Sequence, residues 1–230
     1  MQVAATVVPV ANVLAAGDRW TVLSWLPGVP LTEAGSGGLF SAARALGRIA
    51  SVQLPSAGWI TRDQGIRAFS FGGSRGFLAA RLASPATGDR LGSSRLRKIH
   101  RVVVSQRSRL EQMDSQHCLV HGDFNPTNIL ISEGLVSGIL DWEFSHSGCP
   151  WMDVGNLLRH TDAALRPEIA RGLEAGGMTL SADWQPWARL ADLSAHLQFL
   201  DVGDTPADLV EGSLQWLERF VEDFDPGENG

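Results

Sequence analysis

The spacing of apolar side chains divides the chain into a short strand-like N-terminal stretch and a longer, mostly helical remainder. Residues 3–8 and 20–25 are apolar runs separated by an Ala-Gly-Asp turn at 16–18, which predicts two short strands. Proline and glycine residues over 27–38 then interrupt regular structure. We therefore expect a small sheet that ends in a hinge.

Apolar positions that recur every three or four residues predict helices over most of the remaining chain. The expected helices cover 39–54, 75–84, 93–113, a segment through 157–158, 167–175, 183–200 and 205–224. Residues 55–76 are poor in this periodicity. The glycine cluster within them, at 71–76, is expected to be a plain loop, because it lacks the order of a phosphate-binding loop. Residues 225–230 are expected to fray.

One pair of apolar runs predicts a β-hairpin within the helical part. Residues 129–131 and 136–140 flank the turn signal Ser-Glu-Gly at 132–134. Pairing the two runs about a centre near Gly134 and Leu135 places Asn128 opposite Asp141 at the open end of the hairpin.

The side chains at this open end suit a hard cation. Asn128 and Asp141 supply an amide and a carboxylate oxygen, and Asp123 lies on the loop just before them. Oxygen ligands of this kind are preferred by Mg²⁺, which keeps water and substrate phosphates in its remaining positions. The pattern predicts a magnesium site.

Composition and charge narrow the class of protein. The 230 residues include 44% hydrophobic ones, enough for a packed core, and the net charge of −6 with a pI near 5.5 excludes nucleic acid and anionic membranes as main partners. No apolar run approaches the roughly 18 residues of a membrane span, and the apolar opening lacks the basic start of a signal peptide. The two cysteines, Cys118 and Cys149, cannot form a disulfide framework and predict a cytoplasmic protein.

The three oxygen-bearing residues match what phosphoryl transfer requires. The reaction needs a group that orients the attacking hydroxyl and accepts its proton, and metal ligands that neutralise the phosphates. Asp123 can do the first, and Asn128 with Asp141 the second. The five-residue step from Asp123 to Asn128 equals that of the kinase catalytic loop H-R-D-x-x-x-x-N.

The residues of these motifs resemble those of a known family. With H-G-D-x-N-P-x-N-I-L, then I-L-D-W-E and then G-C-P-W-M-D-V-G, the sequence resembles the aminoglycoside phosphotransferase and choline kinase-like family. The likeness runs from the hinge at 25–31 to the C-terminal helices. It implies an α+β, protein kinase-like fold: remnant N-terminal-lobe strands and hinge over 1–29, and a mainly helical C-terminal lobe with an inserted catalytic hairpin over 30–230.

The resemblance also implies roles for single residues. Asp123 would be the catalytic base, and Asn128 and Asp141 would bind Mg²⁺. His121 and Asp153 would support the loop. The implied cofactors are Mg²⁺ and ATP or another nucleoside triphosphate, and the implied partner is a small molecule that bears an acceptor hydroxyl.

The resemblance gives weaker indications for the hinge residues and for Glu143. The backbone at Ser24, Trp25 and Leu26 would contact adenine if the hinge follows the family. Glu143 has two readings that the sequence leaves open: a residue behind the metal ligands, or a solvated side chain.

The segment before the hinge departs from the family pattern. It spans about 24 residues and holds no glycine-rich loop and no lysine, and the chain's single lysine is Lys98. We therefore expect an intact C-terminal lobe and a mostly missing N-terminal lobe. Three explanations are open: a longer gene product, a truncated and weak or inactive relative, or a second copy or partner chain that completes the lobe.

Three functions follow from these features. The first is a small-molecule kinase whose activity is weakened by the missing phosphate-gripping lobe. The alternative is a truncated, non-catalytic pseudokinase that binds a nucleotide or a partner. A metal-dependent phosphoester hydrolase is the third, and it is disfavoured because the site lacks the extra His or Asp ligands of a two-metal centre.

Overall fold

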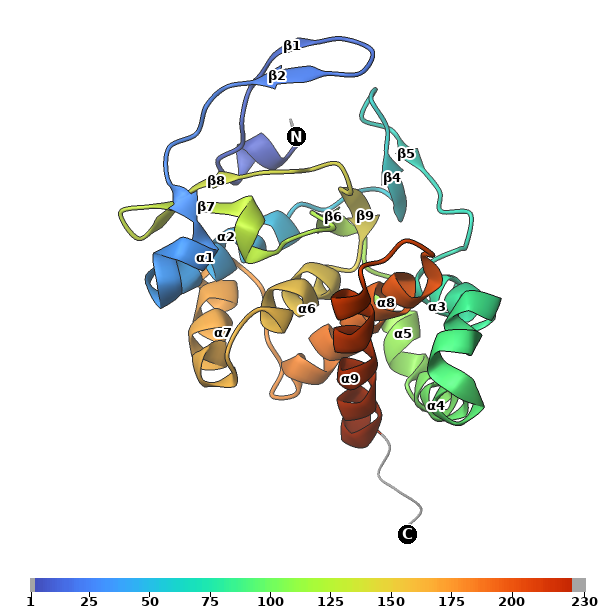
Figure 1. Cartoon of the computed structure of the whole chain (residues 1–230). Coiled ribbons are helices and arrows are strands. Elements are labelled where there is room, and N and C mark those ends of the chain that lie inside the picture. The colour runs from blue at the N-terminus through green and yellow to red at the C-terminus, as the bar shows by residue number, and fades with distance from the viewer. Residues whose placement is uncertain (1–2, 225–230) are drawn as a thin grey trace.

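A computed structural model describes residues 3–224 as small antiparallel sheets above a helical body (Figure 1). The strands are β1 (Val13–Ala16), β2 (Thr21–Leu23), β3 (Val29–Pro30), β4 (Gly58–Ile60), β5 (Ile66–Arg67), β6 (Cys118–Val120), β7 (Ile129–Ser132), β8 (Leu135–Ile139) and β9 (His146–Gly148). The α-helices are α1 (Leu31–Ala34), α2 (Leu39–Ala50), α3 (Ser74–Leu82), α4 (Pro85–Ser105), α5 (Arg107–Asp114), α6 (Trp151–Arg159), α7 (Arg166–Ala175), α8 (Trp184–Asp201) and α9 (Ala207–Phe224). Short 3₁₀ helices cover Ala4–Thr6, Gly35–Gly38, Pro126–Asn128 and Ala163–Leu165.

The predicted hairpin is present as β7 and β8, joined by a two-residue turn. Glu133 and Gly134 have φ angles of 51° and 76°, as a type I′ turn requires. Strand β3 pairs with the outer edge of β7, with Val29 opposite Ile131. The hinge is thereby attached to the hairpin in one three-stranded sheet.

A second sheet has the strand order β5-β4-β9-β6. Strand β6 enters the loop at 121–128 and β9 follows the hairpin, with Val120 opposite His146. The loop therefore runs from one sheet to the other and is held at both ends. Residues 55–76, which show little periodicity, contain β4 and β5, and the plain loop predicted for the glycine cluster at 71–76 is confirmed for 71–73 only, because α3 begins at Ser74. These strands are too short for their side chains to show a period.

The N-terminal strands differ from the prediction. Residues 3–8 do not form a strand: Ala4–Thr6 is a 3₁₀ helix, and Ala4 and Val8 are buried in the core. The partner of β2 is β1, with Val13 opposite Leu23. The apolar run at 3–8 reflects burial against the body, which periodicity over six residues cannot distinguish from a strand.

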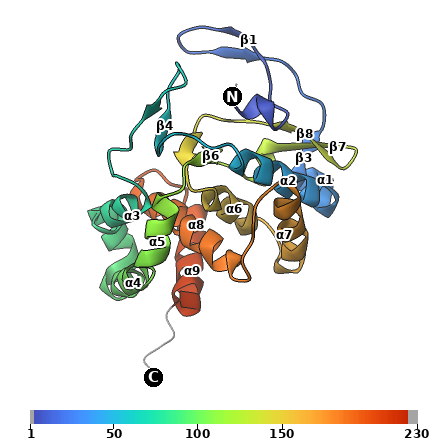
Figure 2. The ribbon, with the colours of Figure 1, turned by 180° about the vertical axis from the view of Figure 1, so that it is seen from behind.

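The helical body covers the lower side of both sheets, as the view from behind also shows (Figure 2). Helix α2 packs against α7, and α8 packs against both α6 and α9. The prediction of one helix over 93–113 is wrong, since α4 ends at Ser105 and α5 begins at Arg107. Helix α4 is itself kinked at Gly92, where φ is 72°. Within residues 3–224, no helix combines the length and apolar content needed to cross a bilayer.

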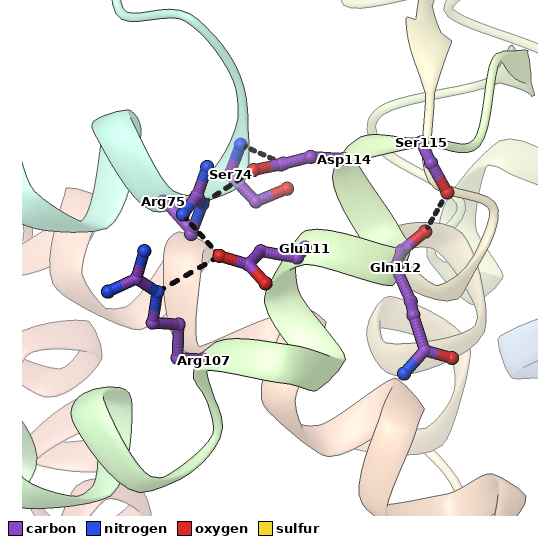
Figure 3. Close-up of polar contacts among 7 residues, drawn as sticks. All are labelled: Ser74, Arg75, Arg107, Glu111, Gln112, Asp114 and Ser115. Carbon is purple, nitrogen blue, oxygen red and sulfur yellow. Dashed lines mark hydrogen bonds and ion pairs between the residues drawn. The ribbon is translucent and has the colours of Figure 1, made fainter.

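Polar contacts fasten α3 to α5 (Figure 3). The Asp114 carboxylate accepts the backbone N–H of Ser74 at 2.6 Å, at the first turn of α3. Arg75 and Arg107 both donate to Glu111, at 2.8 and 2.9 Å. Because these ion pairs are exposed, each contributes only about 0–1 kcal/mol, and the helix-end contact of Asp114 is the more specific anchor. Helix α5 leads directly into β6, so this anchor links the β4–β5–α3 segment to the strand that precedes the candidate site.

Candidate active site

The register of β7 and β8 sets the relative positions of Asn128 and Asp141. Ile129 pairs with Ile139, and the Leu140 N–H donates to the Asn128 carbonyl at 2.8 Å. The prediction that Asn128 lies opposite Asp141 is therefore wrong by one residue. An irregularity between Leu130 and Ile131 shifts the register along the hairpin. Asp141 follows with a φ of 58°, so the chain leaves the strand conformation at this carboxylate.

Three amide side chains hold the Asp123 carboxylate. Oδ2 accepts a hydrogen bond from Asn128 Nδ2 at 3.0 Å. Oδ1 accepts one from Asn125 Nδ2 at 2.8 Å and one from Asn156 Nδ2 at 3.3 Å. These donors are neutral, so they fix the carboxylate in place without a paired cation. Oδ2, which accepts one of these three hydrogen bonds, keeps capacity for a further one, such as one from an acceptor hydroxyl.

Asn125 also starts the 3₁₀ helix that carries Asn128. Its Oδ1 accepts the backbone N–H of Thr127 at 2.9 Å, an N-cap contact. One side chain thus ties the loop conformation to the orientation of Asp123.

Asp153 binds the loop from the first turn of α6. Its Oδ2 accepts the backbone N–H of His121 at 2.6 Å and its Oδ1 accepts that of Gly122 at 2.9 Å. The residue is 1% exposed. Burial raises the pKa of Asp153 to about 7, while the two backbone donors lower it and the charge of Asp123 raises it. The carboxylate fixes the backbone just before Asp123.

His121 connects the loop to the end of the hairpin. Its Nε2 lies 2.8 Å from the Leu140 carbonyl, and its ring centroid lies 4.5 Å from that of Trp142. Burial lowers the pKa of His121, although the Leu140 carbonyl and the nearby carboxylates Asp123 and Asp141 oppose this. The loop is also anchored by Phe124, which is fully buried.

Gly122 occupies a position that only glycine fits. Its φ is 87°, and a Cβ there would lie 2.4 Å from the Phe144 carbonyl oxygen. The loop therefore passes directly against the segment that follows Asp141.

The free oxygens of Asn128 and Asp141 fit a magnesium ion. Asn128 uses its Nδ2 to donate to both the Asp123 carbonyl and carboxylate at 3.0 Å, which leaves its Oδ1 as an acceptor. The Asp141 carboxylate is exposed and has no hydrogen-bond or ion-pair partner among the described residues. Hard oxygen donors of this kind suit Mg²⁺. Within the same residues, no group of three or more His, Cys, Asp or Glu could hold a metal, so a cation here would need further ligands from phosphate and water.

The hinge lies against the hairpin. A Cβ on Gly138 of β8 would lie 2.6 Å from Leu26 Cδ1, so the two segments are in close contact. The Ser24 N–H donates to the Asn12 carbonyl at 2.8 Å and is therefore engaged. In the part of the chain that the structure describes, the N–H groups of Trp25 and Leu26 have no backbone partner.

The structure thus joins His121, Asp123, Asn128 and Asp153 in one hydrogen-bonded unit, with Asp141 next to it. Sequence reasoning missed three residues that complete the unit: Gly122, Asn125 and Asn156. Asn125 lies inside the motif at 121–128, so the motif could have identified it. Asn156 follows Asp153 by one helical turn, a spacing that places both on one face of α6.

Glu143 is exposed and has no hydrogen-bond or ion-pair partner within residues 3–224. Its side chain is solvated in this structure.

The sequence is similar to known proteins. The profile of the phosphotransferase enzyme family (APH) matches residues 1–193. Among curated proteins, a 50-residue segment is 46% identical to acyl-CoA dehydrogenase family member 11 of Mus musculus, covering 21% of this chain and 6% of that protein. The match thus spans only a small part of that relative.

Several solved structures share the fold. A thermostable mutant of aminoglycoside phosphotransferase APH(4)-Ia, in a ternary complex with AMP-PNP and hygromycin B, superposes with a TM-score of 0.72 at 20% identity, covering 96% of this chain and 79% of that one. ADP-bound APH(2″)-Ib gives a TM-score of 0.61 at 17% identity, with 94% and 77% covered. Macrolide 2′-phosphotransferase MphH from Brachybacterium faecium gives 0.56 at 15% identity, with 100% and 79% covered. At these identities the likeness establishes the α+β, kinase-like fold.

Proposed function

The chain belongs to the phosphotransferase enzyme family, and from that premise we propose that it transfers the terminal phosphate of ATP, or of another nucleoside triphosphate, to a hydroxyl group of a small molecule. The observation that carries the proposal is the Asp123 carboxylate, which is held by the amides of Asn125, Asn128 and Asn156 and has no cationic partner among the described residues. Such a carboxylate is positioned to accept a hydroxyl proton.

The residues around Asp123 have separable roles in this proposal. Asp123 orients the acceptor hydroxyl and takes its proton. His121 and Asp153 position the loop through its backbone. Asn128 and Asp141 would hold Mg²⁺, which when bound neutralises phosphate charge.

The nucleotide base would lie at the hinge, where Trp25 and Leu26 offer backbone N–H groups. Ser24 has only its carbonyl to offer there, because its N–H is engaged with Asn12. The AMP-PNP and ADP complexes of the structural neighbours support a nucleotide as the ligand.

The acceptor is proposed to be a small hydroxylated molecule. Hygromycin B in the complex of the APH(4)-Ia mutant supports this class. A cytoplasmic location is proposed on the two cysteines, which are both free thiols.

One observation favours a second candidate, a non-catalytic relative that binds a nucleotide or a partner. Lys98, the only lysine, lies on α4, which Figure 1 shows at the lower edge of the molecule, away from β7 and β8. Lys98 therefore cannot grip the phosphates of a nucleotide at the hinge. Loss of one such cationic contact lowers rates by roughly a hundredfold or more. The two candidate functions are therefore a weak kinase and a pseudokinase. Completion of the site by a second copy or a partner chain stays a prediction.

Two measurements on the full chain separate these candidates. The first is the melting temperature with and without ATP and Mg²⁺, and the second is phosphate transfer to a panel of hydroxylated small molecules. For a kinase, Asp123→Asn should retain the ATP-dependent shift and lose about 10²–10⁴-fold in turnover. A shift without turnover in the wild type supports the pseudokinase. Turnover that Asp123→Asn leaves unchanged refutes the proposed chemistry.

A further inference from the structure

A cavity of about 240 Å³ lies at the far end of α6 from the candidate active site. Asp153 is in the first turn of α6, whereas Arg159, its last residue, lines the cavity. Arg166 from the start of α7 and Arg189 from α8 line it as well, and Trp216 of α9 forms an apolar wall. Three helices therefore each bring an arginine to the wall of one partly open cavity.

The charges around this cavity do not balance. Arg159 pairs with Asp192, and Arg189 pairs with Asp223. Arg166 instead donates to the neutral amide of Gln185, with 2.9 Å between Nη1 and Oε1, and no described carboxylate pairs with it. Among the described residues that line the cavity, three arginines against two aspartates leave one positive charge, in a protein whose net charge is −6.

Donors are also left unused. The Nε atoms of Arg166 and Arg189 are buried and have no hydrogen-bond partner within residues 3–224. Burial lowers the pKa of Arg189, and the positive charges of Arg166 and Arg219 lower it further, against the opposite effect of Asp223. A positive charge without a counter-charge is costly in a partly buried setting, and a bound anion would offset the repulsion between these arginines.

We propose that this cavity binds a small phosphate-like oxyanion. Guanidinium groups form strong, charge-assisted hydrogen bonds to phosphate oxygens. Because the donors come from three helices and not from one plane, they suit a tetrahedral anion better than a planar carboxylate. The volume is below the roughly 300–1,000 Å³ of pockets for drug-sized ligands, so the cavity cannot enclose a whole nucleotide, whereas free phosphate or the phosphate end of a small metabolite fits.

The site is independent of the proposed kinase activity, so its test avoids the nucleotide site. The full chain is titrated calorimetrically with inorganic phosphate, and in a second arm with glycerol 3-phosphate, in buffer without Mg²⁺ and at constant ionic strength set with NaCl. Saturable binding of either is expected, together with a rise in melting temperature that chloride does not give. Tighter binding in the second arm identifies a phosphate ester as the ligand, and the reverse identifies free phosphate.

Two substitutions assign the binding to this cavity. Gln185→Glu places a carboxylate beside Arg166 and should raise the melting temperature without phosphate while weakening phosphate binding about tenfold or more. Arg166→Gln should weaken it to a similar extent by removing the unbalanced cation. Arg95→Gln is the matched control, because Arg95 is an exposed arginine on α4 paired with Glu218, and it should bind phosphate as the wild type does.

Absence of saturable binding in both arms overturns the proposal. It is equally overturned if Gln185→Glu keeps wild-type phosphate affinity, or if Arg95→Gln loses as much affinity as Arg166→Gln. Since Gln185→Glu is expected to stabilise the fold, its result does not depend on a destabilised variant.

Discussion

The Nδ1 atom of His121 accepts a hydrogen bond from the backbone N–H of Asp123, with 3.2 Å between the two nitrogens. A backbone N–H can only donate, so Nδ1 carries no proton and the neutral ring has its hydrogen on Nε2, where it donates to the Leu140 carbonyl at 2.8 Å. Protonation of Nδ1 would set two donors against each other. The position of Asp123 therefore depends on a neutral histidine.

This arrangement predicts a loss of stability in mild acid. Burial lowers the pKa of His121 from its ordinary value of 6.5, so the unfolded chain takes up the proton first as the pH falls. The stabilisation is fully present above about pH 6.5 and is lost as the pH falls below that value toward the folded pKa. The free energy of unfolding, measured between about pH 8 and about pH 5, should fall more steeply for the wild type than for His121→Gln. Burial also lowers the pKa of His146 and His196 and raises that of Asp153, whose protonation acts in the opposite direction; all three residues remain in both proteins, so the difference reports on His121. Parallel pH profiles would contradict the neutral-ring assignment.

Removal of the Asp153 carboxylate should destabilise the loop strongly. Asp153→Ala leaves the N–H groups of His121 and Gly122 without their acceptor. Each lost acceptor should lower the free energy of unfolding, measured by urea denaturation, by about 1–3 kcal/mol. Asp153→Asn keeps one oxygen acceptor and should lose less. Asp162→Ala, at an exposed aspartate without a capping contact, should change stability by less than about 0.5 kcal/mol. Similar losses for Asp153→Ala and Asp162→Ala would show that the backbone contacts contribute little.

Gly122→Ala should disturb both stability and activity. The new Cβ combines the strain of a φ of 87° with a 2.4 Å approach to the Phe144 carbonyl oxygen. Gly134→Ala is a matched control, because its φ is 76° but the nearest atom to its Cβ, the Gly37 carbonyl oxygen, lies 3.8 Å away. We expect about 1 kcal/mol of strain in the control and clearly more in Gly122→Ala, with reduced turnover only in the latter. Equal melting temperatures for the two variants would contradict the close contact.

Magnesium-dependent nucleotide binding should require Asp141. For the wild type, ATP with Mg²⁺ at a hundred times its Kd stabilises by about 2.7 kcal/mol, and omission of Mg²⁺ should remove most of this. Asp141→Asn should lose the magnesium-dependent part of the shift in melting temperature. Glu143→Gln should keep it, because the Glu143 side chain is solvated. A shift that Asp141→Asn retains would exclude Asp141 as a ligand.

The buried carboxylate of Asp192 should be among the costliest to remove. It is 4% exposed, pairs with Arg159, and lies 3.3 Å from Nε2 of His196. Asp192→Asn leaves Arg159 without its counter-charge in a poorly solvated setting and should cost about 3–5 kcal/mol in unfolding free energy. Glu218→Gln breaks the exposed pair with Arg95 and should cost no more than about 1 kcal/mol. A small effect of Asp192→Asn would mean that water reaches this pair.

The sequence by itself determined the features that depend on neighbouring residues. The turn at Glu133 and Gly134, the hairpin around it and most helices follow from local periodicity and turn chemistry, because these signals lie within a few residues of one another. The motif at 121–128 also identified Asp123 and Asn128, which the structure joins by a hydrogen bond. Their catalytic and metal-binding roles stay predictions.

Only the tertiary structure decided what depends on contacts between distant segments. The pairs beside the turn at Glu133 and Gly134 would set Asn128 opposite Ile139, and the irregularity between Leu130 and Ile131 shifts Asn128 by one residue to Leu140. Strand β3 paired with β7 across about 100 residues of chain. Asn156 reached Asp123 because Asp153 fixes α6 to the loop. The arginine-lined cavity exists only because α6, α7 and α8 converge. Sheet register and burial are set by packing of the whole chain, and no local pattern encodes them.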